Sequence, residues 1–172
     1  MIRTITATVN NSSGVLNRIT GLFARRQFNI ESITVGVTEN PEISRMTFVV
    51  NVDNDRALDQ VIKQLNKQVD VLKVRDISGD TIVARELALI KVVSTPQNRS
   101  EIETLARPFR ASIVDVGRDS VTLQVTGDHQ KVEALIDLLK PYGIKELART
   151  GATALKRSSK SQSQELKYSF IQ

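Results

Sequence analysis

The chain has 172 residues, of which 40% are hydrophobic and 25% are charged, a balance typical of folded globular proteins. It contains no cysteine, which excludes disulfides, thiolate nucleophiles and cysteine-bound metal sites. The net charge is +5, but much of the excess lies in residues 153–172. The rest of the chain therefore gives little support for a basic nucleic-acid-binding face.

The N-terminal sequence enters an alternating pattern directly and lacks the basic flank and apolar core of a signal peptide. No segment approaches the roughly 18 consecutive apolar residues that a membrane-spanning helix needs. We therefore expect a cytoplasmic protein with no membrane partner.

The first half of the chain alternates between strand and helix periodicities. Ile5, Ala7 and Val9 recur at every second residue, which predicts a half-buried strand, and apolar residues then recur at helical spacing. Asn40 and Pro41 indicate a turn between two further alternating segments. The order is βαββαβ, with strands over residues 4–9, 33–37, 46–52 and 69–74 and helices over residues 14–27 and 57–65.

The second half repeats this order with little identity of sequence. A strand is expected near residues 87–93, and Ile102, Leu105 and Phe109 fit a helix. A hairpin around Gly117 follows, and then come a helix over residues 132–139 and a strand over residues 144–148. The repeated order predicts an α+β protein of two ferredoxin-like βαββαβ units.

Each unit is expected to have an antiparallel sheet with helices on one face. We expect the first unit over residues 1–77, a linker over 78–84, the second unit over 85–155 and a flexible tail over 156–172. An uncovered sheet face or edge with apolar residues commonly pairs with a second copy, so we predict a homodimer.

The sequence contains few residues of the types that commonly carry out catalysis. The one histidine, His129, follows Asp128 at an expected helix start, where it is most simply a solvated first-turn residue. The sequence has no P-loop, nucleophile elbow or Gly-x-Gly-x-x-Gly motif, and with one histidine and no cysteine we predict no metal site. We expect a chain that is not itself an enzyme.

The turn before the first helix, residues 10–16, is the best candidate for a binding site. A serine before a helical stripe predicts an N-cap, and the first helical turn exposes N–H groups that favour a carboxylate. Gly14 permits close backbone approach, and the Asn11 amide can accept from an ammonium group or donate to a carboxylate. The same residues are also explained by ordinary turn chemistry.

Several segments resemble the small regulatory subunits of acetohydroxyacid synthase, also called acetolactate synthase. In the first unit the resemblance lies in NSSGVLNRI (11–19), GLFARR (21–26), FNIESITV (28–35) and SRMT (44–47), with QLNK (64–67) and VDVL (69–72) further on. In the second unit it lies in RELALIKV (85–92) and ELARTG (146–151). The resemblance extends to about residue 155.

This resemblance implies that the first unit is an ACT domain and that the chain is a non-catalytic regulatory subunit in branched-chain amino acid biosynthesis. It implies a homodimer that binds valine, leucine or isoleucine across its interface and confers feedback inhibition. It also implies a catalytic large subunit as partner, which the chain activates and which carries thiamine diphosphate, Mg and FAD, with no cofactor on this chain.

The resemblance also implies roles for particular residues. Asn11 and Gly14 would hold the polar end of the ligand from one protomer, and Asn29 would contribute from the other. Backbone donors and apolar wall residues complete the set: Ser12, Ser13 and Val15 as donors, and Ile30, Ile33 and Val35 as walls.

Two alternative functions share this element order. An ACT-type regulator of another pathway would share the fold and the turn. An RNA-recognition module would share the βαββαβ order, but it needs stacking aromatic residues on its third strand, where only Phe48 is present. We therefore expect no nucleic acid partner.

Overall fold

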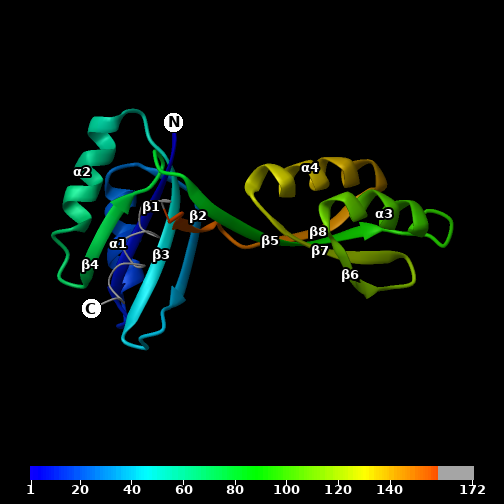
Figure 1. Ribbon diagram of the computed structural model, residues 1–172, viewed down its shortest axis with the longest axis horizontal. Coiled ribbons are helices and arrows are strands. Elements are labelled where there is room, and N and C mark those ends of the chain that lie inside the picture. Colours follow the sequence, from blue (N-terminus) through cyan, green and yellow to red (C-terminus); the bar gives the residue numbers. More distant parts are fainter. Residues whose placement is uncertain (159–172) are drawn as a thin grey trace, which may run out of the picture.

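The computed structural model describes residues 1–158. Its first unit is one antiparallel sheet with strand order β2-β3-β1-β4 and two helices on one face (Figure 1). This arrangement confirms the predicted ferredoxin-like unit. Its elements are β1 (Ile2–Asn10), α1 (Val15–Arg25), β2 (Asn29–Val37), β3 (Ile43–Asn51), α2 (Asp55–Leu65) and β4 (Val71–Asp76).

The second unit repeats the fold, with strand order β6-β7-β5-β8 and helices α3 and α4 on one face of the sheet. Short 3-10 turns, Arg107–Phe109 and Lys140–Tyr142, follow its two helices. Its elements are β5 (Ile82–Val93), α3 (Arg99–Ala106), β6 (Ser112–Val116), β7 (Ser120–Gly127), α4 (His129–Leu139), β8 (Ile144–Arg149) and β9 (Thr153–Lys156).

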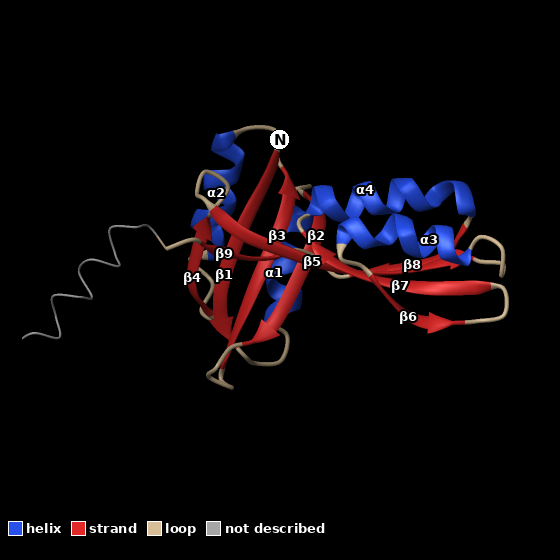
Figure 2. Ribbon diagram, turned by 45° about the vertical axis from the view of Figure 1, so that its right-hand side comes forward, coloured by secondary structure: helices blue, strands red, loops and turns tan. Residues whose placement is uncertain are grey.

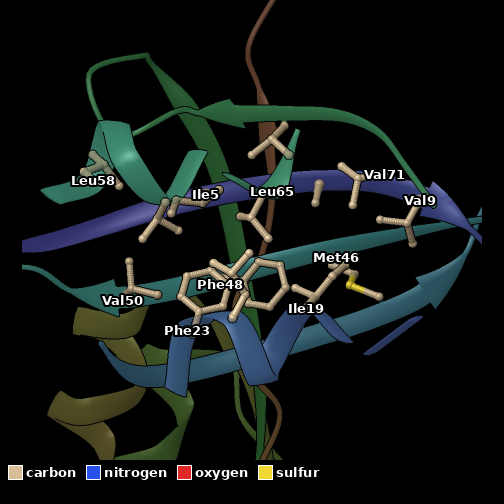
Figure 3. Packing of buried hydrophobic residues seen from close by; sticks show 14 of the residues in the cluster. Ile5, Val9, Ile19, Phe23, Met46, Phe48, Val50, Leu58, Leu65 and Val71 are labelled. Atoms are coloured by element: carbon tan, nitrogen blue, oxygen red, sulfur yellow. The ribbon is translucent and has the colours of Figure 1, made fainter. Parts of the chain in front are cut away.

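Each unit has its own core between sheet and helices. In the first unit, Phe23 of α1 packs on Phe48 of β3 with ring centroids 5.0 Å apart (Figure 3). Both side chains are almost completely buried, as are Ile5 and Leu65 beside them. The second core includes Ile90, Leu123 and Leu139, with no solvent exposure. Each unit therefore buries its apolar face in a separate core, as expected for two distinct folding units.

The connection between the units differs from the expected linker over residues 78–84. Strand β5 already begins at Ile82 and is long enough to extend from the first unit into the second (Figures 1 and 2). Its first four residues pair with β9, which the sequence pattern did not predict because four residues are too few to show a period. The expected tail overlaps β9 at Lys156, and its residues 159–172 lie outside the described part of the chain.

The segment containing β9 lies on the outer face of the first sheet. Ala154 is completely buried there, and the Arg45 guanidinium donates to its carbonyl oxygen at 3.3 Å. Gly151 lies so close to β2 that a Cβ atom would stand 2.8 Å from the Ile33 carbonyl oxygen. Thr6 and Thr47, in the middle of this face, are buried as a result. The chain therefore covers part of this face itself, and β2 remains an unpaired edge of the sheet.

The described helices include none that is long and apolar enough to cross a membrane.

Candidate functional site

The turn between β1 and α1 is built around Gly14. This residue occupies the N-cap position with φ of 81°, in the left-handed region that residues other than glycine rarely adopt. The predicted serine cap is wrong: no side chain caps α1, and the Ser12 hydroxyl lies 3.5 Å from Asp70 instead. A side chain at position 14 would also approach the Arg18 guanidinium, which lies 3.1 Å from the Cβ position.

This left-handed cap leaves backbone donors free at the start of α1. Within residues 1–158, the N–H groups of Ser13, Gly14, Leu16 and Asn17 have no hydrogen-bond partner. Two of the expected donors are already used, because Ser12 N–H donates to the Asn10 carbonyl and Val15 N–H points to the Ser12 carbonyl at 3.4 Å. The side chain of Val15 belongs to the core. The free donors and the positive end of the helix dipole together favour a carboxylate.

Asn11 is held firmly beside these donors. Its backbone N–H donates to the Glu42 carbonyl at 2.7 Å, and its side-chain Nδ2 donates to the Pro41 carbonyl at 2.8 Å. The Asn11 Oδ1 atom has no hydrogen-bond partner among residues 1–158, so it can accept from an ammonium group, and Nδ2 keeps one further N–H donor. The β2–β3 turn therefore orients Asn11, a contribution that the sequence pattern did not show.

The apolar residues of β2 supply a wall near this turn. Ile33, Val35 and Val37 lie on the helix-covered face of the sheet, because they pair with residues of β3 whose side chains are buried. Val35 and Val37 are 42% and 58% exposed at the sheet edge. Val37 was not among the wall residues that the resemblance implied, although it continues the alternation of Ile33 and Val35 along β2.

Asn29 lies at the opposite end of β2 from the turn. It pairs with Asn51, which pairs with Ile2 at the start of β1, whereas Val37 is in register with Ser44 and Val9 at the other end. Its side chain donates to Glu31 at 3.0 Å. A single copy of the chain therefore does not bring Asn29 to Asn11.

Comparison with known proteins matches both units to one family. A family model described as "AHAS small subunit-like ACT domain" matches residues 5–73, and one described as "Small subunit of acetolactate synthase" matches residues 85–158. The chain belongs to the acetolactate synthase small-subunit family. The family predicted from the sequence is thus confirmed, as is the fold.

Individual relatives agree over nearly the whole chain. The acetolactate synthase small subunit of Bacillus subtilis is 64% identical over 159 residues, which cover 92% of each chain. The probable acetolactate synthase small subunit of Archaeoglobus fulgidus is 55% identical, covering 93% of this chain and 99% of the relative. The crystal structure of the small subunit from Thermotoga maritima has a TM-score of 0.84 at 40% identity, covering 92% of this chain and 99% of that one.

A groove of about 770 Å³ separates the two units of this small-subunit chain. Ile30 and Ile33, two of the predicted wall residues, line it from the first unit, and Arg149 and His129 line it from the second. Ile30 and Ile33 also pack against the first core. Ile30 follows Asn29 at the start of β2, so within one protomer it lies at the end of the sheet opposite the α1 turn.

His129 begins α4 and its side chain is 64% exposed, as expected of a solvated first-turn residue, but it also contacts a buried carboxylate. Its Nδ1 lies 3.1 Å from Oε1 of the buried Glu86, which also accepts from Arg149 at 3.1 Å. Burial would lower the pKa of Arg149, but its hydrogen bonds to Glu133 and Glu86 raise it, so the guanidinium stays charged. This cluster ties β5, α4 and β8 together. No three His, Asp or Glu side chains in the described part of the chain gather as a metal site would require.

The structure also weighs against the RNA-recognition alternative. Phe48 is completely buried and faces α1, where its ring packs on Phe23. It therefore cannot stack on a base, which is how such modules hold single-stranded RNA.

Proposed function

We propose that this chain is the non-catalytic regulatory subunit of acetohydroxyacid synthase. In this role it activates a catalytic large subunit that carries thiamine diphosphate, Mg and FAD, and it makes that enzyme sensitive to inhibition by valine or another branched-chain amino acid. One observation carries the proposal: a chain of the acetolactate synthase small-subunit family has an open turn with four free N–H donors at the start of α1.

The turn matches the chemistry of a branched-chain amino acid. The free N–H groups of Ser13, Gly14, Leu16 and Asn17 suit the carboxylate, and Asn11 Oδ1 suits the ammonium group. Val35 and Val37 offer apolar surface to a branched side chain. A ligand of this size needs about −5 to −7 kcal/mol for binding in the range of hundreds to tens of micromolar, and it reaches this only when largely enclosed. The open turn of one protomer does not enclose it.

A second copy would complete the enclosure. Strand β2 is an unpaired edge, and its exposed Val35 and Val37 are typical of an edge that finds a partner. Antiparallel pairing of two β2 strands about Ile33 would set Asn29 of one copy against Val37 of the other. Since Val37 lies at the same end of the sheet as Asn11, each interface would then form two equivalent sites, each with Asn11 from one protomer and Asn29 from the other.

A complementation experiment tests this shared site. We expect that Asn11→Ala and Asn29→Ala homodimers each lose valine inhibition while still activating the catalytic subunit, because every site contains one altered residue. In a mixed dimer of the two variants, one site carries both substitutions and the other carries none. A purified mixed dimer should therefore have about half of the wild-type valine-binding capacity, and an equal mixture that reassociates at random should have about a quarter, measured by isothermal titration.

Asn66→Ala is the matched control, since Asn66 is an exposed residue at the end of α2 that, among residues 1–158, donates only to the Ile62 carbonyl. It should leave valine binding unchanged. D-Valine and L-lysine should not bind to the wild-type chain. If mixing restores no capacity, the two asparagines belong to one protomer's site or to none, and the shared site is wrong. If the wild-type chain does not bind valine, leucine or isoleucine at all, the feedback role is wrong.

A further inference from the structure

A second group of polar residues lies on the other face of the first sheet, away from the helices. Strand register sets Thr8 of β1 between Arg45 of β3 and Lys73 of β4, and it sets Thr6 between Thr47 and Arg75 in the next row. The basic side chains and the threonine hydroxyls therefore form two adjacent rows on one surface.

Strand β9 closes this surface into a pocket. Lys156 of β9 lines a cavity of about 230 Å³ together with Thr6, Thr8, Arg45, Lys73 and Arg75. Four of the lining residues are basic and none is acidic. Segments far apart in the sequence thus bring four positive charges to one small space, and we refer to these six residues as the cationic pocket.

The charges of the cationic pocket are largely unbalanced. Among residues 1–158, Arg45, Lys73 and Arg75 have no carboxylate partner, and only Lys156 has one, with its ammonium 2.7 Å from Asp80. Arg45 makes one long hydrogen bond, to the Ala154 carbonyl at 3.3 Å, and its buried Nε has no hydrogen-bond partner. Lys73, Arg75 and Lys156 are exposed to solvent and Arg45 is half-buried, so an anion that enters the cavity from solvent meets several cations at once.

We propose that the cationic pocket binds a small phosphate-bearing anion. A doubly or more highly charged oxyanion matches several basic groups at once, and its many acceptor oxygens suit both guanidinium and threonine hydroxyl donors. The cavity volume admits an anion of the size of phosphate or pyrophosphate. The site is separate from the α1 turn, because it lies on the opposite face of the sheet.

Binding there would join the two units. Lys156 belongs to β9, whereas the other five residues belong to the first sheet. An anion held between them would fix β9 against that sheet, and through β9 it would fix the start of β5. The proposal therefore also predicts slower exchange of the backbone amides of β9 and its partner segment when the anion is bound.

Isothermal titration of the full chain with inorganic pyrophosphate tests the proposal. We expect one anion per chain and an affinity that falls as sodium chloride is raised, because salt screens the charges. Lys73→Gln and Arg75→Gln should each weaken binding about tenfold, the effect of one lost charge-assisted contact. Lys63→Gln and Arg56→Gln remove the same charges from exposed positions on α2 and should bind as the wild type does.

Hydrogen exchange gives a second measurement. At a pyrophosphate concentration near the wild-type dissociation constant, the amide exchange of residues 153–156 should slow clearly in the wild type and much less in Arg75→Gln. The proposal is overturned if pyrophosphate does not bind, or if the α2 variants weaken binding as much as the pocket variants. It is also overturned if a single-stranded RNA oligonucleotide binds through Lys73 and Arg75 while pyrophosphate does not. Valine titration of the same variants keeps this result separate from the proposed function, since the α1 turn is untouched in them.

Discussion

The two units contain the same connection between first strand and first helix, but among residues 1–158 a side chain accepts from a backbone N–H of this connection in the second unit alone. In the first unit, residues 11–14 leave several N–H donors free at the start of α1. In the second unit, Ser94, Thr95 and Asn98 use theirs, whereas the N–H groups of Gln97, Ser100 and Glu101 have no partner among residues 1–158. Ser94 is completely buried and its N–H donates to the Asp119 carbonyl, while Thr95 N–H donates to Asn98 Oδ1 at 2.7 Å.

Arg99 completes the closure of the second turn. Its Nη2 donates to the Gly117 carbonyl at 3.0 Å, and its Nε lies 3.4 Å from Ser94 Oγ. The first turn instead has Gly14 at the N-cap in a left-handed conformation, and neither α1 nor α3 has a capping side chain. The same fold can therefore carry two differently built turns, and the difference depends on a few residues at the helix start rather than on the architecture.

Filling the open turn should have the largest effect. Gly14→Asp would place a side chain against Arg18 at a φ of 81°, and its carboxylate would repel that of the effector. We expect the valine concentration for half-maximal inhibition to rise roughly 100-fold, the loss of two charge-assisted hydrogen bonds. Activation of the catalytic subunit should remain. Both are measured in an activity assay of the reconstituted enzyme.

Gly79→Asp provides the control for this change, because Gly79 lies in the turn after β4 with no atoms near its Cβ position. It adds the same charge without touching the α1 turn and should leave inhibition as in the wild type. Equal loss of inhibition in both variants would show that added charge, not the turn, is responsible.

The sequence predicted the open turn only in part, for identifiable reasons. Gly14 and Asn11 were found because their types suit a turn, but the serines were expected to cap α1. The cap position depends on the backbone conformation of Gly14, which no side-chain pattern encodes. The location of Asn29 could not be predicted from one chain, since a site shared between copies requires strand register and a partner.

The fold was more predictable than its connections. One face of β1, of β3 and of α1 is buried against the same core. Apolar residues therefore recur at the period of a strand or a helix, and such a period can be recognised in the sequence. Strand β9 and the cationic pocket depend on contacts between residues far apart in the sequence, such as Arg45 with Ala154. Such contacts produce no periodic pattern in the sequence. The basic residues of the cationic pocket could not be grouped from the sequence, because strand register brings them together.

A second difference between the units concerns the outer faces of their sheets, and Gly151 tests it. The first sheet is partly covered by the segment leading to β9, where a Cβ on Gly151 would stand 2.7 Å from Thr34 Oγ1 and 2.8 Å from the Ile33 carbonyl. Gly151→Ala should therefore lower the free energy of unfolding by about 1–3 kcal/mol, the usual cost of overpacking. Urea denaturation measures this. Gly79→Ala, made where space is open, should change stability far less, and a similar loss in both would contradict close packing at Gly151.

The smallest effect is expected from opening the closed turn. Arg99→Gln removes the hydrogen bond to the Gly117 carbonyl and the contact with Ser94, on a partly buried side chain. The free energy of unfolding should fall by about 1 kcal/mol, the net value of a typical hydrogen bond. Valine inhibition should not change, because the proposed effector site lies in the first unit. A changed valine response in Arg99→Gln, with stability intact, would show that the second unit transmits the effector signal and that its closed turn is part of the regulatory path.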